Sequence, residues 1–327
     1  MKRVFGLDTD QVGAAPHVVA VGAFDGVHLG HVHTLREVCQ QARERGGASA
    51  ALTFDPSPRE LDAGIRQPGQ RLTPLHEQLH LLEHLGLDLA LVLEFPGTVQ
   101  QMPPETFARE VLVGALNAVC VCASETHRFG AGGRGDVRGL QRLARDLGFE
   151  VIVAEPFTVN ARRVSSTWVR ELLAQGQVHE AAALLGRPYA IFAEVVSGRG
   201  AGASLGFPTA NLRIPPEKTI PRDGVYAGIA ARVTADCEPL EEVRPAAINV
   251  GSAPTFGRED HLVEAHIVGQ QDDLGGAHLK IELLRWLRRV QRFADEDALA
   301  RQIAEDVNRS REAAQASESA AHGDAEA

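Results

Sequence analysis

The chain has 327 residues, of which 44% are hydrophobic and 23% charged, and its formal net charge at pH 7 is -10. This length exceeds what one hydrophobic core usually supports, so we expect a globular protein of two domains. The acidic balance opposes broad contact with a phosphate backbone, and nucleic acid is therefore not an expected partner.

The cysteines and the apolar runs bear on the compartment. The four cysteines are scattered, and their spacing is not that of zinc ligands: Cys39, Cys120, Cys122 and Cys237. An acidic residue, Asp8, interrupts the start of the chain before a signal-like apolar core forms, and no later run reaches the length of a membrane span. We therefore expect reduced cysteines, no membrane partner and a cytoplasmic location.

The first half of the chain alternates short apolar runs with longer amphipathic segments. The runs that predict strands are residues 18–21, 50–54, 89–93, 118–123 and 151–154. The segments that predict helices are residues 31–45, 74–85, 104–116 and 140–147. This alternation predicts an α/β domain with a parallel sheet, whose ligands bind beyond the carboxyl ends of the strands.

The pattern changes after a helical stretch at residues 166–185, which ends at Gly186-Arg187-Pro188. Short alternating runs follow and predict a small antiparallel barrel or sandwich: residues 190–196, 225–233, 246–250, 261–268 and 279–284. A last amphipathic helix is expected from about Asp295 to Asn308. We therefore expect domains at residues 1–186 and 187–308, followed by a disordered tail at 309–327 that is rich in Ala, Ser, Glu and Asp.

A glycine-rich turn follows the first predicted strand. Residues 22–31 read Gly-Ala-Phe-Asp-Gly-Val-His-Leu-Gly-His. Backbone N–H groups and a helix dipole converge on an anion at such a turn. His28 and His31 can face a triphosphate at the helix start, and Gly30 removes a side chain that would keep the nucleotide away. The alternative is a set of surface histidines or an adventitious metal site, but the surrounding motif favours nucleotide binding.

A second polar segment closes the predicted α/β domain. Ser165, Ser166 and Thr167 stand at a helix start, with Arg170 one turn further along. Such hydroxyls commonly cap a helix. With the arginine they also suit binding of a leaving pyrophosphate.

The third motif lies in the second domain. A glycine-rich segment at residues 198–206 leads into Phe-Pro-Thr-Ala-Asn at 207–211. Thr209 and Asn211 are two residues apart on an extended segment, so their oxygens point to one side and suit Mg²⁺ that bridges ATP phosphates. An ordinary turn with bonds from side chain to backbone is the alternative.

Seven segments, in order, resemble the bacterial bifunctional riboflavin kinase/FAD synthetase family: residues 22–31, 53–56, 71–73, 129–130, 135–136, 165–170 and 184–189. The riboflavin kinase part continues at residues 206–212, 221–226, 249–256 and 263–266. The resemblance implies an N-terminal Rossmann-like nucleotidyltransferase α/β domain, then a riboflavin kinase-like β-barrel with a C-terminal helix. It also implies two reactions: riboflavin and ATP give FMN, and FMN and ATP give FAD and pyrophosphate.

The resemblance implies the following site residues. Glu264 is the base that takes the proton of the ribityl hydroxyl, and His28 and His31 act in adenylyl transfer. ATP is bound by Gly22, Phe24, Asp25, Gly30, Ser165, Ser166, Thr167 and Arg170 in the first domain and by Gly198, Gly200, Gly206 and Pro208 in the second. The flavin contacts Asp55, Thr126 and Phe129, and Mg²⁺ is held by Thr209 and Asn211. The expected partners are riboflavin, FMN and ATP, with a monomer or weak homo-oligomer as the assembly.

The chain departs from the family pattern at several positions. Thr126 and His127 replace an amide or acid and an aromatic residue, and Ser57 stands where the family often has histidine. In the second domain Val290 replaces a common acidic residue, and residues 268–276 lack the usual tyrosine. Two alternatives therefore stay open: a riboflavin kinase with a weak or inactive adenylyltransferase domain, and a non-catalytic flavin-binding regulatory protein.

Overall fold

The computed structural model describes residues 1–7, 9–56, 69–94, 98–197, 206–252, 261–270 and 272–323. The chain forms two compact units, Met1–Ser166 and Thr167–Ala327. The division falls at residue 166, whereas the sequence predicts it at residue 186.

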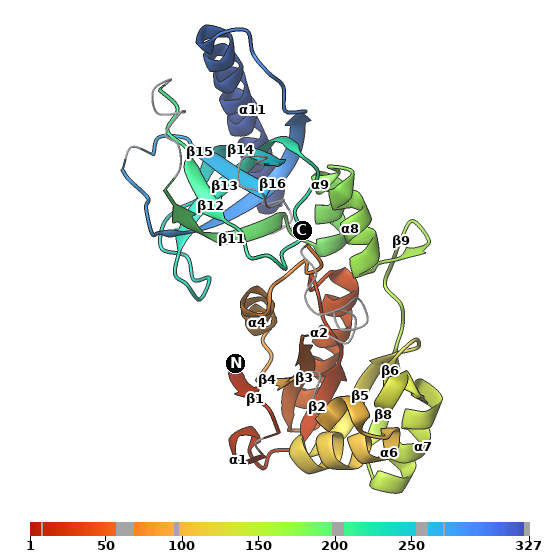
Figure 1. Ribbon diagram of the computed structural model, residues 1–327. Helices are drawn as coiled ribbons and strands as arrows, with labels where there is room; N and C mark the ends of the chain where they lie inside the picture. Colours follow the sequence, from red (N-terminus) through yellow and green to blue (C-terminus); the bar gives the residue numbers. More distant parts are fainter. Residues whose placement is uncertain are drawn as a thin grey trace. The chain divides into compact units, whose positions relative to one another are not determined.

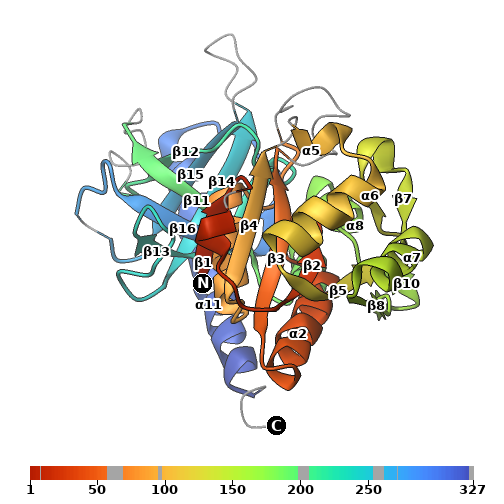
Figure 2. The ribbon, with the colours of Figure 1, turned by 90° about the horizontal axis from the view of Figure 1, so that it is seen from below.

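A six-stranded parallel sheet forms the centre of the first unit (Figures 1 and 2). In sheet order the strands are β1 (Lys2–Phe5), β4 (Leu89–Glu94), β3 (Ala48–Asp55), β2 (His17–Val21), β5 (Ala118–Ser124) and β8 (Glu150–Ala154). Every pairing is parallel, so the carboxyl ends of the strands share one edge. The predicted α/β class is confirmed. Strand β1 was missed because, of its four side chains, only that of Val4 is buried.

Helices cover both faces of this sheet. Helices α2 (Leu29–Glu44) and α4 (Leu75–His84) pack on one face, while the π-helix η1 (Phe107–Ala115) and α7 (Val137–Leu147) pack on the other. Alternate residues of β2 fall into two separate apolar clusters, one on each face. The strands are therefore buried on both sides, which explains their nearly continuous apolar sequence.

The shorter elements of this unit connect the strands at its edges. They are α1 (Thr9–Val12), α5 (Thr98–Gln101), α6 (Pro104–Thr106), β6 (Arg128–Phe129), the 3-10 helix η2 (Ala131–Gly133), β7 (Gly135–Asp136), β9 (Thr158–Val159) and β10 (Arg162–Arg163).

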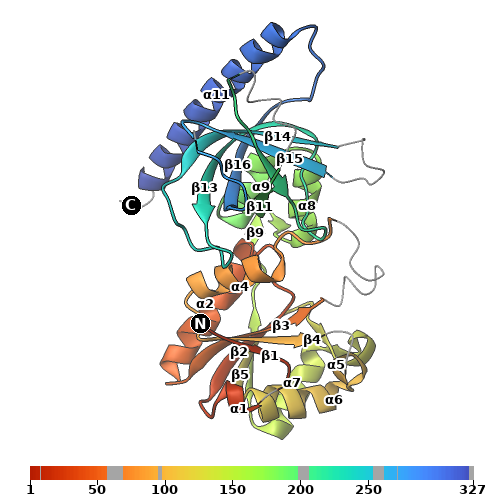
Figure 3. The same ribbon diagram turned by 60° about the vertical axis from the view of Figure 1, so that its left-hand side comes forward.

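The second unit is built on a closed antiparallel barrel, which decides between the two predicted alternatives (Figure 3). In barrel order its strands are β11 (Tyr189–Val196), β12 (Ala210–Arg213), β15 (His261–Ile267), β14 (Arg244–Ser252), β13 (Gly224–Val233) and β16 (His278–Arg288). Alternate side chains fill the interior and are almost fully buried: Ile191, Tyr226, Ile248, Val263, Ile281 and Leu283. The intervening side chains lie on the outer face.

Two helices precede the barrel and pack on it. Helix α8 (Ser166–Ala174) is followed by α9 (Val178–Leu185), which contacts β11 and β16. The Arg222 N–H donates to the Leu173 carbonyl at 3.0 Å, and the Trp286 ring lies against Gly176. These contacts group both helices with the barrel, so the division between the units falls after the first residue of α8.

The tail predicted as disordered is largely helical. Helix α11 spans Glu296–Gly323 and lies along the outside of the barrel (Figures 1 and 3). Ser310 and Ala314 are buried, and Ala313 packs against the apolar cluster of Val225, Ala227 and Leu287. Disorder is therefore wrong for residues 309–323. The composition misled because alanine favours helix, and small side chains allow the helix to approach the barrel closely.

Candidate functional site

The first candidate site is the turn that joins β2 to α2, at the carboxyl edge of the sheet. Phe24, Gly26 and Val27 have positive φ values of 45°, 84° and 39°. Side chains at positive φ strain the backbone, whereas glycine adopts this conformation without that cost. The turn therefore depends on the rest of the unit to hold its shape.

Side chains from other segments brace this turn. The Asp25 carboxylate accepts the Thr73 N–H at 3.0 Å, and the Gly26 N–H donates to Thr73 Oγ1 at 2.8 Å. Gln78 Nε2 donates to a carbonyl oxygen of the turn at 2.9 Å. Ser166 Oγ donates to the Asp25 carbonyl at 2.9 Å. Asp25 is predicted to bind ATP, and its carboxylate also holds the turn in place through the bond from Thr73.

Neither Thr73 nor Gln78 was among the predicted site residues. Both are buried, with 5% and 3% exposure. Gln78 also donates to Thr53 Oγ1 at 3.1 Å. The available signal was a polar residue on the core-facing side of the predicted helix 74–85, because such a residue needs a partner.

The two predicted histidines lie together at the start of α2. The rings of His28 and His31 stack with centroids 3.6 Å apart and an interplanar angle of 15°. The His31 N–H donates to Nδ1 of His28 at 3.3 Å, so His28 is the N-cap of the helix. A nitrogen that accepts carries no proton, so the neutral His28 ring carries its proton on Nε2 and donates there.

Glycine at position 30 also serves this histidine pair. A Cβ on Gly30 would lie 3.2 Å from the His28 ring, which would have to move. The ring of Phe24 meets His31 edge-on at 5.5 Å. Gly30 and Phe24, both predicted to bind ATP, therefore also set the positions of the two imidazoles.

The predicted flavin contacts come from the ends of β3 and β5. Asp55 ends β3, and its carboxylate accepts Arg71 Nη2 at 2.6 Å. Thr126 lies in the turn after β5 and accepts Arg163 Nη1 at 3.0 Å. The ring of Phe129 is 5% exposed and packs on Phe107, so it belongs to the core. Asp55 and Thr126 are thus the more accessible of the three.

We expect His127 to make the stability of the first unit depend on pH. Its ring stacks on Phe129 with centroids 5.8 Å apart, and burial lowers its pKa from 6.5 to about 4. Above pH 6.5 the ring is neutral in both the folded and the unfolded state. As the pH falls from 6.5 towards 4, the unfolded chain binds a proton that the folded protein does not bind. We expect the free energy of unfolding to fall by on the order of 1 to 3 kcal/mol across this range.

The variant His127→Phe keeps an aromatic ring and removes the titration. Urea denaturation of both proteins, followed by circular dichroism at about pH 7.5 and about pH 5, measures the difference. The wild type should lose more stability than the variant. Equal losses would assign the pH dependence to other groups.

The polar segment at residues 165–170 spans the boundary between the two units. Ser165 and Ser166 belong to the first, whereas Thr167 and Arg170 belong to the second. Ser166 contacts the turn directly, as described above. The roles of Thr167 and Arg170 in ATP binding stay predictions.

The second candidate site lies on the outer face of the barrel. Glu264 of β15 is paired with Asn211 of β12 on one side and with Asn249 of β14 on the other. Residues paired across neighbouring strands present their side chains on the same face. Asn249 Nδ2 donates to Glu264 Oε2 at 3.5 Å, and Asn211 is 8% exposed. A carboxylate is thus flanked by two amides. Asn249 begins the segment 249–256 that resembles the family, but it was not among the predicted site residues.

The strand of Glu264 also holds the segment before Asn211. His266 Nδ1 lies 2.8 Å from the Pro208 carbonyl and donates to it, because a carbonyl only accepts. The Phe207 ring meets the His266 ring edge-on at 5.4 Å. Thr209 directly precedes β12, and Gly206 has a φ of 83°. Gly198, Gly200 and Ser57 lie outside the described residues.

Two absences hold for the part of the chain that the structure describes. No three His, Cys, Asp or Glu side chains there are grouped to hold a metal ion. Within the same residues, no helix is both long and apolar enough to traverse a membrane.

Comparisons with known proteins bear on both units. The FAD synthetase family model matches residues 11–168, and the riboflavin kinase family model matches residues 185–314. A bifunctional riboflavin kinase/FMN adenylyltransferase from Escherichia coli strain K12 is 35% identical over 295 residues, which are 90% of this chain and 92% of that protein. A protein of the same description from Haemophilus influenzae is 33% identical, covering 88% and 91% of the two chains.

A solved structure has the same fold. It is described as a macrolide-efflux protein from Streptococcus pneumoniae, with a TM-score of 0.84 and 25% identity. The match covers 95% of this chain and 99% of that one. With the two family models and the curated relatives, this confirms the resemblance found in the sequence. The chain therefore belongs to the bifunctional riboflavin kinase/FMN adenylyltransferase family and carries the adenylyltransferase activity in its parallel-sheet unit and the kinase activity in its barrel unit.

Proposed function

We propose that riboflavin is phosphorylated on the outer face of the barrel, with Glu264 as the general base. The observation that supports this is the register that sets Asn211 and Asn249 on either side of Glu264. Asn249 limits how the Glu264 carboxylate can turn. The carboxylate takes the proton of the ribityl hydroxyl while that oxygen bonds to the γ-phosphorus of ATP and the bond to the leaving ADP breaks.

Mg²⁺ fits the donors of this site. Thr209 and Asn211 offer a hydroxyl and an amide oxygen, which are hard ligands of the kind Mg²⁺ accepts beside ATP phosphates. If Thr209 and Asn211 held Mg²⁺, it would supply positive charge that neutralises the phosphate oxygens. His266 fixes the Pro208 carbonyl and thereby the backbone that leads into Thr209.

The adenylyl transfer takes place at the turn between β2 and α2. A phosphate oxygen of FMN bonds to the α-phosphorus of ATP, and the bond to pyrophosphate breaks. This step requires no proton transfer from the nucleophile, so His28 and His31 act as hydrogen-bond donors to the phosphate oxygens. The Nε2–H of His28 follows from the bond that its Nδ1 accepts.

The remaining features of the proposal concern the assembly and the cell. The product of the barrel unit is the substrate of the first unit, so the two sites act in sequence. We assign the protein to the cytoplasm, which suits its four buried, unbridged cysteines. A monomer or weak homo-oligomer is proposed as its assembly.

A time course tests the proposal. Purified protein is incubated with riboflavin, ATP and Mg²⁺, and the flavins are separated by chromatography. FMN should appear first and FAD should follow, and chelation of Mg²⁺ should stop riboflavin phosphorylation. FMN without FAD would point to an inactive first site. Conversion of neither riboflavin nor supplied FMN would overturn both site assignments.

A further inference from the structure

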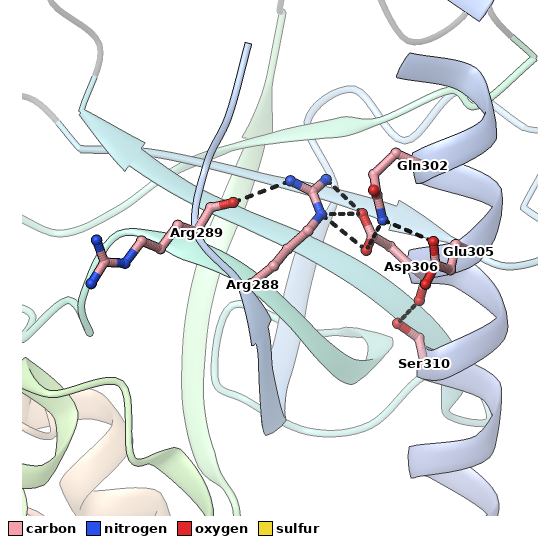
Figure 4. A network of polar contacts seen from close by, with 6 residues as sticks. All are labelled: Arg288, Arg289, Gln302, Glu305, Asp306 and Ser310. Carbon is pink, nitrogen blue, oxygen red and sulfur yellow. Dashed lines mark hydrogen bonds and ion pairs between the residues drawn. The ribbon is translucent and has the colours of Figure 1, made fainter. Parts of the chain in front are cut away.

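An ion pair joins the end of β16 to helix α11 (Figure 4). Arg288 Nε lies 3.1 Å from each carboxylate oxygen of Asp306, and Arg288 Nη2 lies 2.7 Å from Oδ2. Asp306 is 2% exposed. A guanidinium fork on a buried carboxylate fixes both distance and orientation, and loss of one partner would leave a buried charge.

Neighbouring groups complete this network. Gln302 Nε2 donates to Asp306 Oδ1 at 3.3 Å, and Arg288 Nη1 donates to the Arg289 carbonyl at 3.2 Å (Figure 4). The guanidinium carbon of Arg288 also lies 5.6 Å from the centre of the Phe293 ring. Arg288 is thus held in place by contacts with Arg289 and Phe293, while its ion pair with Asp306 holds helix α11.

Arg288 and Glu264 belong to one row of residues that are paired across neighbouring strands of the barrel. Arg288 is paired with Val225 of β13, Val225 with Asn249 of β14, and Asn249 with Glu264 of β15. Through Ala313, helix α11 packs against the apolar cluster of Val225, Ala227 and Leu287, and it also contacts β14, the strand of Asn249. Neighbouring strands are about 4.8 Å apart, so Val225 lies roughly 10 Å from the strand position of Glu264. Helix α11 therefore covers the strands on the side of Glu264 where Asn249 lies.

We propose that Arg288 and Asp306 are positioning residues for riboflavin phosphorylation: their ion pair holds α11 where the helix borders the riboflavin site next to Asn249. The inference rests on the proposed site at Glu264. Asn211, the proposed ATP-side ligand, lies on the opposite side of Glu264 from α11. A displaced helix therefore weakens binding of riboflavin and leaves binding of ATP unchanged.

The variant Asp306→Asn tests this inference in the full-length protein. We expect the KM for riboflavin to rise about tenfold or more, while kcat at saturation and the KM for ATP change less than about threefold. FAD formation from supplied FMN serves as an internal control for the first unit and should be unchanged. Arg288→Lys keeps the charge and loses the fork, so its riboflavin KM should lie between those of the wild type and Asp306→Asn.

A matched control is available on the same barrel. Arg232 and Glu241 form an ion pair of 2.8 Å that is exposed to solvent, with side-chain exposures of 44% and 37%. Glu241→Gln should therefore change the riboflavin KM less than about twofold. If both residues act through their ion pair, the riboflavin KM of the double variant Arg288→Gln/Asp306→Asn should not exceed the higher KM of its two single variants.

Other results would overturn the inference. An unchanged riboflavin KM in folded Asp306→Asn would overturn it. A fall in kcat together with equal rises in the KM for riboflavin and the KM for ATP would also overturn it, because that result indicates a merely structural role. If Asp306→Asn does not fold, Arg288→Lys decides by the same KM comparison. The Glu264→Gln variant separates the two proposals. If it still phosphorylates riboflavin, the proposed site is rejected. If it does not, and the riboflavin KM of Asp306→Asn is unchanged, only the positioning role of the ion pair is rejected.

Discussion

We expect the Glu264→Gln variant to phosphorylate riboflavin on the order of 10² to 10⁴ times more slowly than the wild type. Glutamine keeps the shape of the side chain and an oxygen that can accept from Asn249, but it cannot take the proton of the ribityl hydroxyl. The structural position of the carboxylate between two amides is thus preserved while the base is lost. The rate of FMN formation under saturating ATP measures the effect.

The bifunctional chain supplies the control for this variant. Supplied FMN should be converted to FAD at the wild-type rate, because the first unit is unchanged. Glu194→Gln is the matched substitution: Glu194 lies on β11 and forms an ion pair of 2.8 Å with Arg213 of β12, whereas Glu264 lies on β15. It should alter FMN formation less than about twofold. A Glu264→Gln protein with normal kinase activity would exclude Glu264 as the base.

The second large effect is expected at the histidine pair. We expect His28→Asn to slow FAD formation from FMN by on the order of 10² to 10³, the usual cost of one lost donor to a developing charge. Asparagine is a good N-cap, so its side-chain oxygen can still accept the His31 N–H. The shorter side chain loses the donor at Nε2. Steady-state kinetics with supplied FMN and ATP measures the change.

Two comparisons sharpen this result. His28→Ala removes both the cap and the donor, so it should lose about 1 kcal/mol of stability in addition to activity. His33 lies on the same helix but is exposed, and His33→Ala should leave FAD formation within about twofold of the wild type. Riboflavin phosphorylation should persist in all three variants. Normal FAD formation by His28→Asn would show that the Nε2 donor is dispensable.

The local part of the first site was predictable from the sequence. A strand, a glycine-containing turn and a helix with histidines three residues apart form a contiguous segment, so their order along the chain determines their proximity. The alternation of apolar runs and amphipathic segments likewise determined the parallel sheet, because the period of burial is a local property.

Other parts of both sites depend on residues far apart in the sequence. Thr73 and Gln78 brace the turn at residues 23–26 through bonds between segments separated by roughly fifty residues. Their polar side chains carry no local signal of what they contact. The pairing of Asn249 with Glu264 follows from the register of two antiparallel strands, and a shift of one residue would turn the side chains to the other face.

The architecture and the C-terminal helix show the same contrast between local features and features that depend on the fold. The two-part architecture, the family and the local motifs at His28 and Asn211 could be predicted from the sequence, because they depend on the order and type of neighbouring residues. The helix at residues 309–323 could not, since burial of its small side chains against the barrel stabilises it. The ion pair between Asp306 and Arg288 likewise depends on the fold, because barrel closure and helix packing bring those two charges together.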